Sequence, residues 1–274
     1  MAAARRLACT DAGARTAQML LCHVLGLSRE ALAAHDDEAL DAGEEARLEE
    51  LLARRLAGEP AAYVLGEKEF YGRDLRVDRS TLIPRPETED LVDAALAHFL
   101  PDAAVCFADL GTGSGCIAVT LAAERPRWSG TALDISPEAL RVAQGNAQRH
   151  GVDARIRFLQ ADFAAPLPLP PGKFDLVASN PPYVSEEEYA GLDAVVRGYE
   201  PRGALVPGPT GLELAASVVR RAAELLRPGG LLLMEHGWRQ GGACRALCRT
   251  EDWCEAGTGR DLAGRERFLR AVRR

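Results

Sequence analysis

The tetrapeptide Asn180-Pro181-Pro182-Tyr183 combines residue types that could hold a planar amino group. It closely follows the apolar run 174–178, which predicts a buried parallel strand, and open α/β sheets bind ligands at the carboxyl ends of such strands. The prolines restrict the backbone and lack N–H groups, so the local polar groups are mostly acceptors: Asn180 Oδ1 and the carbonyl oxygens of Asn180 and Pro181. Two rigid acceptors beside an aromatic ring suit an –NH2 group. A stiff turn after a strand is the alternative interpretation.

A glycine-rich turn at Gly111, Gly113 and Gly115 is the second motif with chemical potential. It follows a predicted strand, 105–110, and precedes a helical pattern, and a strand, a glycine turn and a helix typically open a Rossmann-like sheet. Cys116 stands where a dinucleotide fingerprint would continue toward its third glycine. The spacing therefore favours a nucleoside ligand that has no pyrophosphate.

Two further positions suit a nucleoside. Asp134 ends a predicted strand 19 residues beyond Gly115, about the distance at which an acid reaches ribose hydroxyls, although it could also cap the next helix. Phe163 follows a third strand and could stack on an adenine ring, with Asp162 accepting from the exocyclic amine. A core phenylalanine beside a loop aspartate is the alternative.

The elements that must position these residues form an α/β pattern. Seven strands are predicted, at 105–110, 131–134, 156–159, 174–178, 231–235, 253–256 and 267–272. The helix that Pro137 opens should face Asn146 and Arg149 outward. The segment 184–210 predicts a long loop, and long ordered loops beside a site are usually functional.

The first part of the chain has a different pattern. Residues 1–66 predict a small amphipathic helical bundle, in which Asp41 and Glu44 resemble a capping box. The bundle carries no catalytic constellation and His23 and His35 have no partners nearby in sequence, so a docking module or a lid is expected. Residues 67–83 predict a β-hairpin linker, and 84–274 form the remaining domain.

Composition limits the function classes. The 274-residue chain has a net charge of −7, which argues against a protein that mainly grips duplex nucleic acid. No apolar run approaches the roughly 20 residues of a membrane span, and no signal peptide is evident. The seven cysteines are scattered, which favours a reduced cytoplasmic protein. Cys244, Cys248 and Cys254 could hold a metal, but their spacing is not a common zinc pattern, so buried small hydrophobes are expected.

Several motifs occur together along the chain. They are 82–89 (Leu-Ile-Pro-Arg-Pro-Glu-Thr-Glu), 109–115 (Asp-Leu-Gly-Thr-Gly-Ser-Gly), 179–183 (Ser-Asn-Pro-Pro-Tyr), Glu200-Pro201 and 235–238 (Glu-His-Gly-Trp). In this combination the chain resembles the HemK family, the peptide chain release factor glutamine methyltransferases. The likeness covers essentially the whole chain, including the helical domain and the hairpin.

The resemblance implies a class I methyltransferase with a seven-stranded Rossmann-like sheet and an N-terminal helical domain. It implies S-adenosyl-L-methionine as cofactor, S-adenosyl-L-homocysteine as product, and class I release factors as protein substrates, methylated on the glutamine of their Gly-Gly-Gln motif. The residues lining the cofactor pocket would be Gly111, Thr112, Gly113, Ser114, Gly115, Asp134, Phe163 and Asn180. Asn180, Pro181, Pro182 and Tyr183 would hold the glutamine amide, with Asn180, Pro181 and Tyr183 as the catalytic residues. Many relatives have tryptophan where Phe163 stands, which leaves a smaller stacking face here.

The expected protein is a cytoplasmic monomer that needs no metal and contacts neither a membrane nor nucleic acid directly. Three other functions remain as alternatives. An adenine-amino methyltransferase would use the same Asn-Pro-Pro-Tyr motif, although net acidity weighs against it. A nucleotide-sensing or scaffold protein would carry a relic pocket, and a nicotinamide dehydrogenase is disfavoured by the glycine spacing.

Overall fold

The computed structural model describes residues 11–34, 39–261 and 263–274. His35 lies outside these ranges. The chain divides into two compact units, Met1–Glu67 and Lys68–Arg274. Among the described residues, no helix is long and apolar enough to cross a membrane.

The first unit is a helical bundle, as predicted. Its helices are α2 (Asp11–Leu25), α3 (Arg29–Ala34), α4 (Ala42–Leu56) and α5 (Ala61–Leu65). Leu20, Leu48, Leu52 and Val64 form its core. The capping box before α4 is confirmed, because Asp41 Oδ1 accepts from the Glu44 N–H at 2.7 Å and Glu44 Oε2 accepts from the Asp41 N–H at 2.9 Å.

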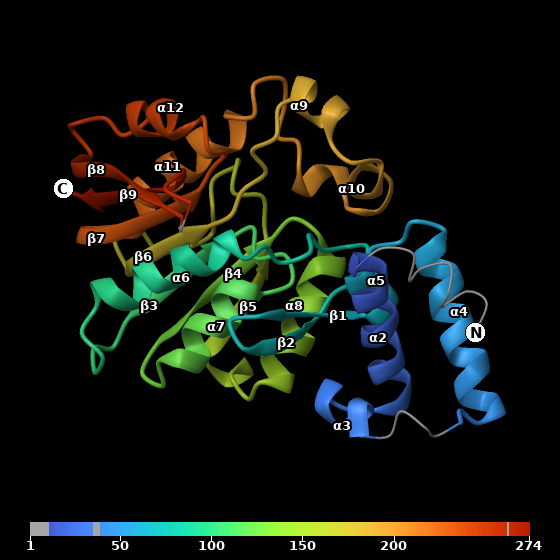
Figure 1. Cartoon of the computed structure of the whole chain (residues 1–274). Helices are drawn as coiled ribbons and strands as arrows, with labels where there is room; N and C mark the ends of the chain where they lie inside the picture. The colour runs from blue at the N-terminus through green and yellow to red at the C-terminus, as the bar shows by residue number, and fades with distance from the viewer. Residues whose placement is uncertain (1–10, 35–38, 262) are drawn as a thin grey trace. The chain divides into compact units, whose positions relative to one another are not determined.

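The second unit contains the predicted seven-stranded sheet, which is confirmed (Figure 1). Its strands are β3 (Cys106–Leu110), β4 (Ser129–Asp134), β5 (Ile156–Gln160), β6 (Phe174–Ser179), β7 (Leu226–Glu235), β8 (Trp253–Arg260) and β9 (Glu266–Arg273). They lie in the order β5-β4-β3-β6-β7-β9-β8. The first five in sequence are parallel, and β9 is antiparallel to both β7 and β8. The strand order reverses between β3 and β6, and this switch point is where such sheets bind ligands.

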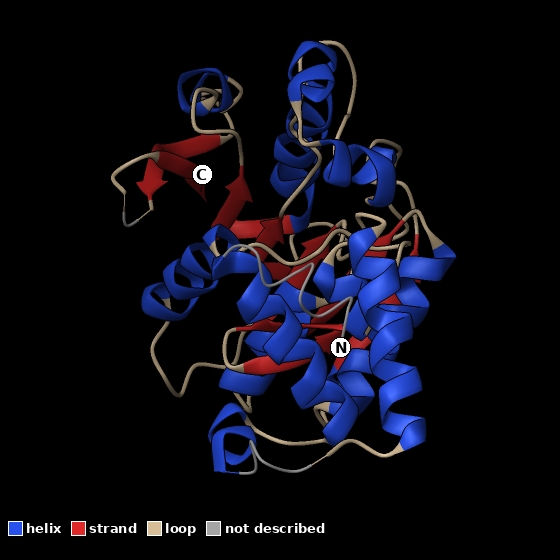
Figure 2. Cartoon of the chain, turned by 45° about the vertical axis from the view of Figure 1, so that its right-hand side comes forward, coloured by secondary structure: helices blue, strands red, loops and turns tan. Residues whose placement is uncertain are grey.

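Helices cover both faces of the sheet. Side chains alternate between the two faces along each strand, so a strand that is apolar throughout buries side chains on both. Phe107 and Leu231 pack on the face covered by α6 (Glu87–His98), α7 (Cys116–Glu124) and α8 (Pro137–Arg149). Ala108 and Leu232 pack on the opposite face, under α11 (Glu213–Leu225) and α12 (Gly241–Ala246). Figure 2 shows the strands near the C-terminus in red, at one end of the sheet. The two apolar faces of each strand explain why the central strands have continuous hydrophobic sequences.

The structure departs from the predicted elements in several places. β4 begins two residues earlier than predicted, at Ser129. β7 begins at Leu226 rather than 231, because Leu226 already pairs with Phe174 of β6, and the register shifts between Phe174 and Leu176. The segment 184–210 is not a continuous loop, since it contains α9 (Glu186–Gly191), α10 (Ala194–Tyr199) and the 3-10 turn Arg202–Ala204. β8 extends to Arg260 along its pairing with β9.

A β-hairpin precedes the sheet, formed by β1 (Glu67–Phe70) and β2 (Arg73–Arg76). Its turn residues, Tyr71 and Gly72, have φ of +53° and +70°. Positive φ at both central residues is the mark of a type I′ turn, whose twist matches that of the flanking strands.

Candidate active site

The Asn-Pro-Pro-Tyr motif and the glycine turn lie next to each other. Ala178 of β6 pairs with Asp109 of β3, and the buried Ser179 hydroxyl donates to the Leu110 carbonyl oxygen at 2.6 Å. Asn180 therefore starts beside Gly111, at the switch point of the sheet. The fold thus brings together two motifs that are far apart in sequence: Leu110 and Ser179 are separated by 69 positions.

The side-chain amide of Asn180 has a fixed direction. Its Nδ2 donates to Thr88 Oγ1 at 3.1 Å, and Thr88 Oγ1 donates to Glu235 Oε2 at 2.6 Å. Asn180 itself is partly exposed. The described part of the chain supplies no hydrogen bond to Asn180 Oδ1 or to the Pro181 carbonyl oxygen. These two acceptors thus remain available to a ligand.

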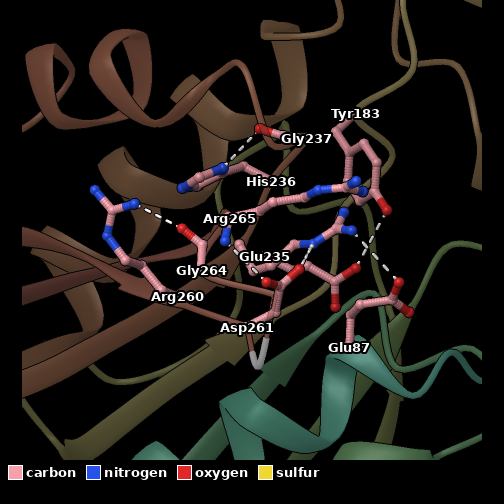
Figure 3. A network of polar contacts seen from close by, with 10 residues as sticks. Glu87, Tyr183, Glu235, His236, Gly237, Arg260, Asp261, Gly264 and Arg265 are labelled. Atoms are coloured by element: carbon pink, nitrogen blue, oxygen red, sulfur yellow. Dashed lines mark hydrogen bonds and ion pairs between the residues drawn. The ribbon is translucent and has the colours of Figure 1, made fainter.

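Glu235 is a site residue that sequence reasoning missed. It ends β7, is 2% exposed, and also accepts from the Tyr183 hydroxyl at Oε1 over 3.2 Å (Figure 3). Burial raises the pKa of Glu235 to about 7, the Thr88 and Tyr183 hydrogen bonds lower it, Glu87 raises it and Arg267 lowers it.

Thr88 is a further site residue that the sequence did not reveal, because its partner Glu235 lies far away along the chain. Both residues belong to motifs that the sequence singles out, 82–89 and 235–238, but Thr88 and Glu235 are 147 positions apart. Their side chains meet because α6 packs against the end of β7, which only the tertiary structure shows. Burial also raises the pKa of Tyr183, the third member of this group.

The glycines of the turn differ in what surrounds them. Gly111, Gly113 and Gly115 all have positive φ, of +77°, +55° and +82°. A Cβ on Gly115 would meet Ala143 of α8 at 3.1 Å, so Gly115 allows α7 and α8 to pack closely. A Cβ on Gly113 would meet nothing within 4 Å, so the backbone there faces open space.

The side chains of Thr112 and Ser114 point away from that space. They are 4% and 2% exposed, and Thr112 Oγ1 donates to Asp109 Oδ2 at 2.7 Å. Their burial leaves the side-chain hydroxyls little surface for a ligand.

Asp134 lies at the predicted place and braces the turn. Its Oδ2 accepts from the Gly113 N–H and its Oδ1 from the Ser136 N–H, both at 2.9 Å. It does not cap α8, because Ser136 is the N-cap and its hydroxyl accepts from the Ala139 N–H. Each carboxylate oxygen of Asp134 keeps acceptor capacity for a ligand hydroxyl.

Phe163 and Asp162 follow β5 as expected. Phe163 is 8% exposed and packs into the core, with its Cε1 3.3 Å from the position that a Cβ on Gly111 would take. Asp162 Oδ1 accepts from the Ala164 N–H at 2.8 Å. The ring of Phe163 therefore borders the glycine turn mainly from within the core.

Asp109 is a second buried acid that sequence reasoning missed. It is fully buried; its Oδ2 accepts from the Thr112 hydroxyl and the Ala118 N–H, and its Oδ1 has no partner among the described residues. Burial raises the pKa of Asp109 to about 7, against the lowering by those two bonds. The sequence shows this residue only as the first letter of the glycine motif.

The expectation that Asn146 faces outward is wrong. Asn146 is fully buried on α8, where its Oδ1 accepts from the Arg76 N–H and its Nδ2 donates to the carbonyl oxygens of Arg76 and Ser114. The side chain thereby joins the hairpin to the glycine turn. An asparagine can take an inward position when backbone groups satisfy its amide, a condition that helical spacing does not reveal.

Glu200, from the predicted Glu-Pro motif, joins the 184–210 segment to residues before α6. It is 5% exposed; its Oε2 accepts from the Ile83 N–H at 3.2 Å and its Oε1 from Arg85 Nη2 at 2.6 Å. Gln240 donates to the Tyr183 carbonyl oxygen at 2.9 Å and accepts from the Gly237 N–H. Glu200 thus fixes the segment before α6, and Gln240 ties the Tyr183 backbone to Gly237.

The cysteines are arranged differently from the expectation. Cys244 is fully buried and Cys248 is half-buried, but Cys254 is exposed on the edge strand β8, so its predicted burial is wrong. On this edge strand only Trp253 is buried and the next four residues are exposed, which a short apolar pattern does not show. Within the described ranges, no group of three or more His, Cys, Asp or Glu residues could hold a metal ion.

Comparison with known proteins follows the same division of the chain. Residues 1–66 match the family model of the PrmC N-terminal domain, and residues 102–264 match a methyltransferase domain model. The chain is 51% identical over 265 residues to a release factor glutamine methyltransferase of Nitratidesulfovibrio vulgaris, covering 96% of this chain and 89% of the relative. It is 47% identical to the corresponding enzyme of Bordetella pertussis, with 92% of both chains covered.

Solved structures share the fold at low sequence identity. A methyltransferase from Pyrococcus furiosus superposes with a TM-score of 0.53 and 17% identity, over 85% of this chain and 98% of that chain. A ribosomal protein L11 methylase from Lactobacillus delbrueckii subsp. bulgaricus superposes with a TM-score of 0.51 and 19% identity, over 69% and 80%. These structures show the fold, while the identities of 51% and 47% to the two relatives along nearly the whole chain, with the methyltransferase domain model, show that the chain belongs to the release factor glutamine methyltransferase family and is a methyltransferase enzyme.

Proposed function

We propose that this enzyme methylates the side-chain amide nitrogen of the glutamine in the Gly-Gly-Gln motif of class I peptide chain release factors, with S-adenosyl-L-methionine as methyl donor. The observation that carries the proposal is the direction of the Asn180 amide, whose Nδ2 is bound to Thr88 so that Oδ1 remains available. The names of the relatives support the same substrate.

The residues around the glycine turn fit this cofactor. Gly113 leaves open space at the backbone, and Asp134 keeps acceptor capacity suited to ribose hydroxyls. Gly111, Gly115 and Phe163 complete the turn and its border, with Thr112 and Ser114 contributing mainly backbone. When bound, the cofactor would supply an electrophilic methyl group and leave as S-adenosyl-L-homocysteine, and the methylated nitrogen would release one of its two protons to solvent.

The chain's own residues would act on the glutamine amide. An amide nitrogen is a poor nucleophile because its lone pair is delocalised over the carbonyl group. Asn180 Oδ1 and the Pro181 carbonyl oxygen would accept its two N–H bonds, which orients the nitrogen and stabilises positive charge as it develops. Orientation of this kind is worth up to roughly 7–11 kcal/mol in favourable cases.

Pro182 and Tyr183 complete this grip. The two prolines keep the acceptor backbone stiff, since each restricts φ. The Tyr183 hydroxyl donates to Glu235, and its ring would pack on the flat amide. Asn180, Pro181 and Tyr183 are the catalytic residues in this scheme.

The remaining features are proposed on the same basis. Residues 1–66 would dock the release factor, 67–83 would link the two parts, and 84–274 would carry the chemistry. The protein would act in the cytoplasm as a monomer, without direct contact to nucleic acid. The cysteines of the described ranges are all free thiols, in keeping with a reducing compartment.

Mass spectrometry of a methylation reaction tests the proposal. Purified enzyme, S-adenosyl-L-methionine and a release factor should yield one added methyl group on the peptide containing Gly-Gly-Gln. A release factor with Gln→Ala at that position and the Asn180→Ala enzyme are the matched controls. Methylation of an adenine-containing oligonucleotide but not of the release factor would overturn the proposal in favour of an adenine-amino methyltransferase.

A further inference from the structure

A chain of three side chains runs from the buried end of β7 to the proposed site. Thr88 and Glu235 are 1% and 2% exposed, and neither is among the residues expected to touch the substrate. Thr88 is bonded on one side to Glu235 Oε2, at 2.6 Å, and on the other to Asn180 Nδ2, at 3.1 Å. The hydroxyl of Thr88 is therefore the only bridge that these contacts provide between the buried carboxyl and the Asn180 amide.

Hydrogen-bond counting fixes the polarity of this chain when Glu235 is ionised. A carboxylate only accepts, and a threonine hydroxyl has a single proton. That proton is donated to Glu235, so Thr88 can only accept from Asn180. The Asn180 amide must then present its NH2 group to Thr88 and its Oδ1 to the substrate.

The same counting removes the constraint when Glu235 is neutral. A protonated carboxyl can donate to Thr88 Oγ1, and the Thr88 proton then becomes free to bond Asn180 Oδ1. This arrangement turns the Asn180 NH2 group toward the substrate. Two NH2 groups would then face each other, and the acceptor that the glutamine amide needs is lost.

We propose that Thr88 and Glu235 are positioning residues that set the orientation of the Asn180 amide: ionised Glu235 fixes Oδ1 toward the glutamine, and neutral Glu235 releases the amide to take either orientation. This inference rests on the proposed function. The Tyr183 hydroxyl donates to Oε1 of the same carboxyl, so Glu235 holds both side chains proposed to face the substrate, Tyr183 directly and Asn180 through Thr88. Neither Thr88 nor Glu235 need touch the substrate.

Several groups surround Glu235 and affect its ionisation. They are Glu87 on α6, Cys116 on α7, Tyr183 after β6, and Arg267 on β9, which also pairs with Asp261 and Glu87. Glu87, Tyr183 and Asp261 are labelled near Glu235 in Figure 3. Burial, the largest cause, raises the pKa of Glu235 to about 7. The switch between the two polarities thus falls near neutral pH, and activity should rise with pH as Glu235 loses its proton.

Kinetics of the intact enzyme test the role of Thr88. Thr88→Val removes the hydroxyl and keeps the shape, and we expect kcat to fall roughly 10- to 100-fold, with little change in the affinity for S-adenosyl-L-methionine. Thr88→Ser should restore most of the activity. Thr120→Val is the matched control, because Thr120 is equally buried in α7 and its hydroxyl has no hydrogen-bond partner in the described part of the chain. A Thr88→Val enzyme as active as the Thr120→Val enzyme would overturn the proposal.

The pH profile tests the role of Glu235. We expect wild-type kcat to rise with a midpoint near pH 7. Glu235→Gln should lose this limb and show a pH-independent kcat below the wild-type plateau, since a glutamine can either donate to or accept from Thr88. An unchanged limb in Glu235→Gln would overturn its role.

A spectroscopic measurement separates this inference from the proposed function. The side-chain 15N resonance of Asn180, followed by NMR in the full chain without substrate, should shift with pH around 7 in the wild type but not in Glu235→Gln. A wild-type enzyme that leaves the release-factor glutamine unmethylated would refute the proposed function alone. An Asn180 amide whose titration is the same in both proteins would refute the positioning role alone.

Discussion

Replacing Asp109 with asparagine should remove a large pH dependence from the stability of the second unit. Asp109 is fully buried at the end of β3, and one of its carboxyl oxygens has no partner among the described residues. Burial raises its pKa from 3.8 to about 7. The folded state therefore holds a proton that the unfolded chain has already released above pH 4.

The sign and size follow from proton linkage. Between pH 4 and 7 the folded state binds more protons than the unfolded state, so the free energy of unfolding falls as pH rises. The slope from this one group is about 1.4 kcal/mol per pH unit, which amounts to about 4 kcal/mol over a shift of about 3 units. In Asp109→Asn, the free energy of unfolding should fall less steeply with pH, by about that slope. A constant change in stability caused by the new amide would not affect this difference in slope.

Denaturant unfolding from pH 5 to 8, followed by tryptophan fluorescence, measures this. The three tryptophans, Trp128, Trp238 and Trp253, all belong to the second unit, so the signal reports that unit. Asp102→Asn, at an exposed position, controls for the loss of one negative charge. Equal slopes for wild type and Asp109→Asn would refute the assignment of a raised pKa to this carboxyl.

Three further predictions concern the site and the first unit. Asn180→Ala should lower kcat about 10²- to 10³-fold while calorimetry finds cofactor binding largely intact, and full activity would contradict the acceptor role. Gly111→Ala should weaken cofactor binding about tenfold, because φ is +77° there and the new Cβ would meet Phe163 at 3.3 Å; Gly151→Ala, also at positive φ but in open space, is the control. Leu52→Ala, in the core of the helical bundle, should destabilise that unit by about 2–5 kcal/mol. It should also raise the KM for the release factor without changing cofactor affinity, and an unchanged KM in a protein with lost helical circular dichroism would argue against docking.

Local sequence was sufficient for the elements and for the residues adjacent to them. Strand, glycine turn and helix are each encoded within a few residues, by apolar runs and by positions that require positive φ. The stiffness of Asn180-Pro181-Pro182-Tyr183 is likewise local, since proline restricts its own φ and the residue before it. These features predicted the sheet, the glycine turn and the acceptors at the end of β6.

Tertiary structure alone decided which side chains meet and which are charged. Thr88, Asn180 and Glu235 come from three separate segments, and their shared hydrogen bonds follow from the packing of α6 against the ends of β6 and β7. The inward turn of Asn146 depends in the same way on the backbone of a distant hairpin. A carboxyl's pKa reflects how much water the fold removes from it, and that quantity is a property of the assembled core rather than of any stretch of sequence.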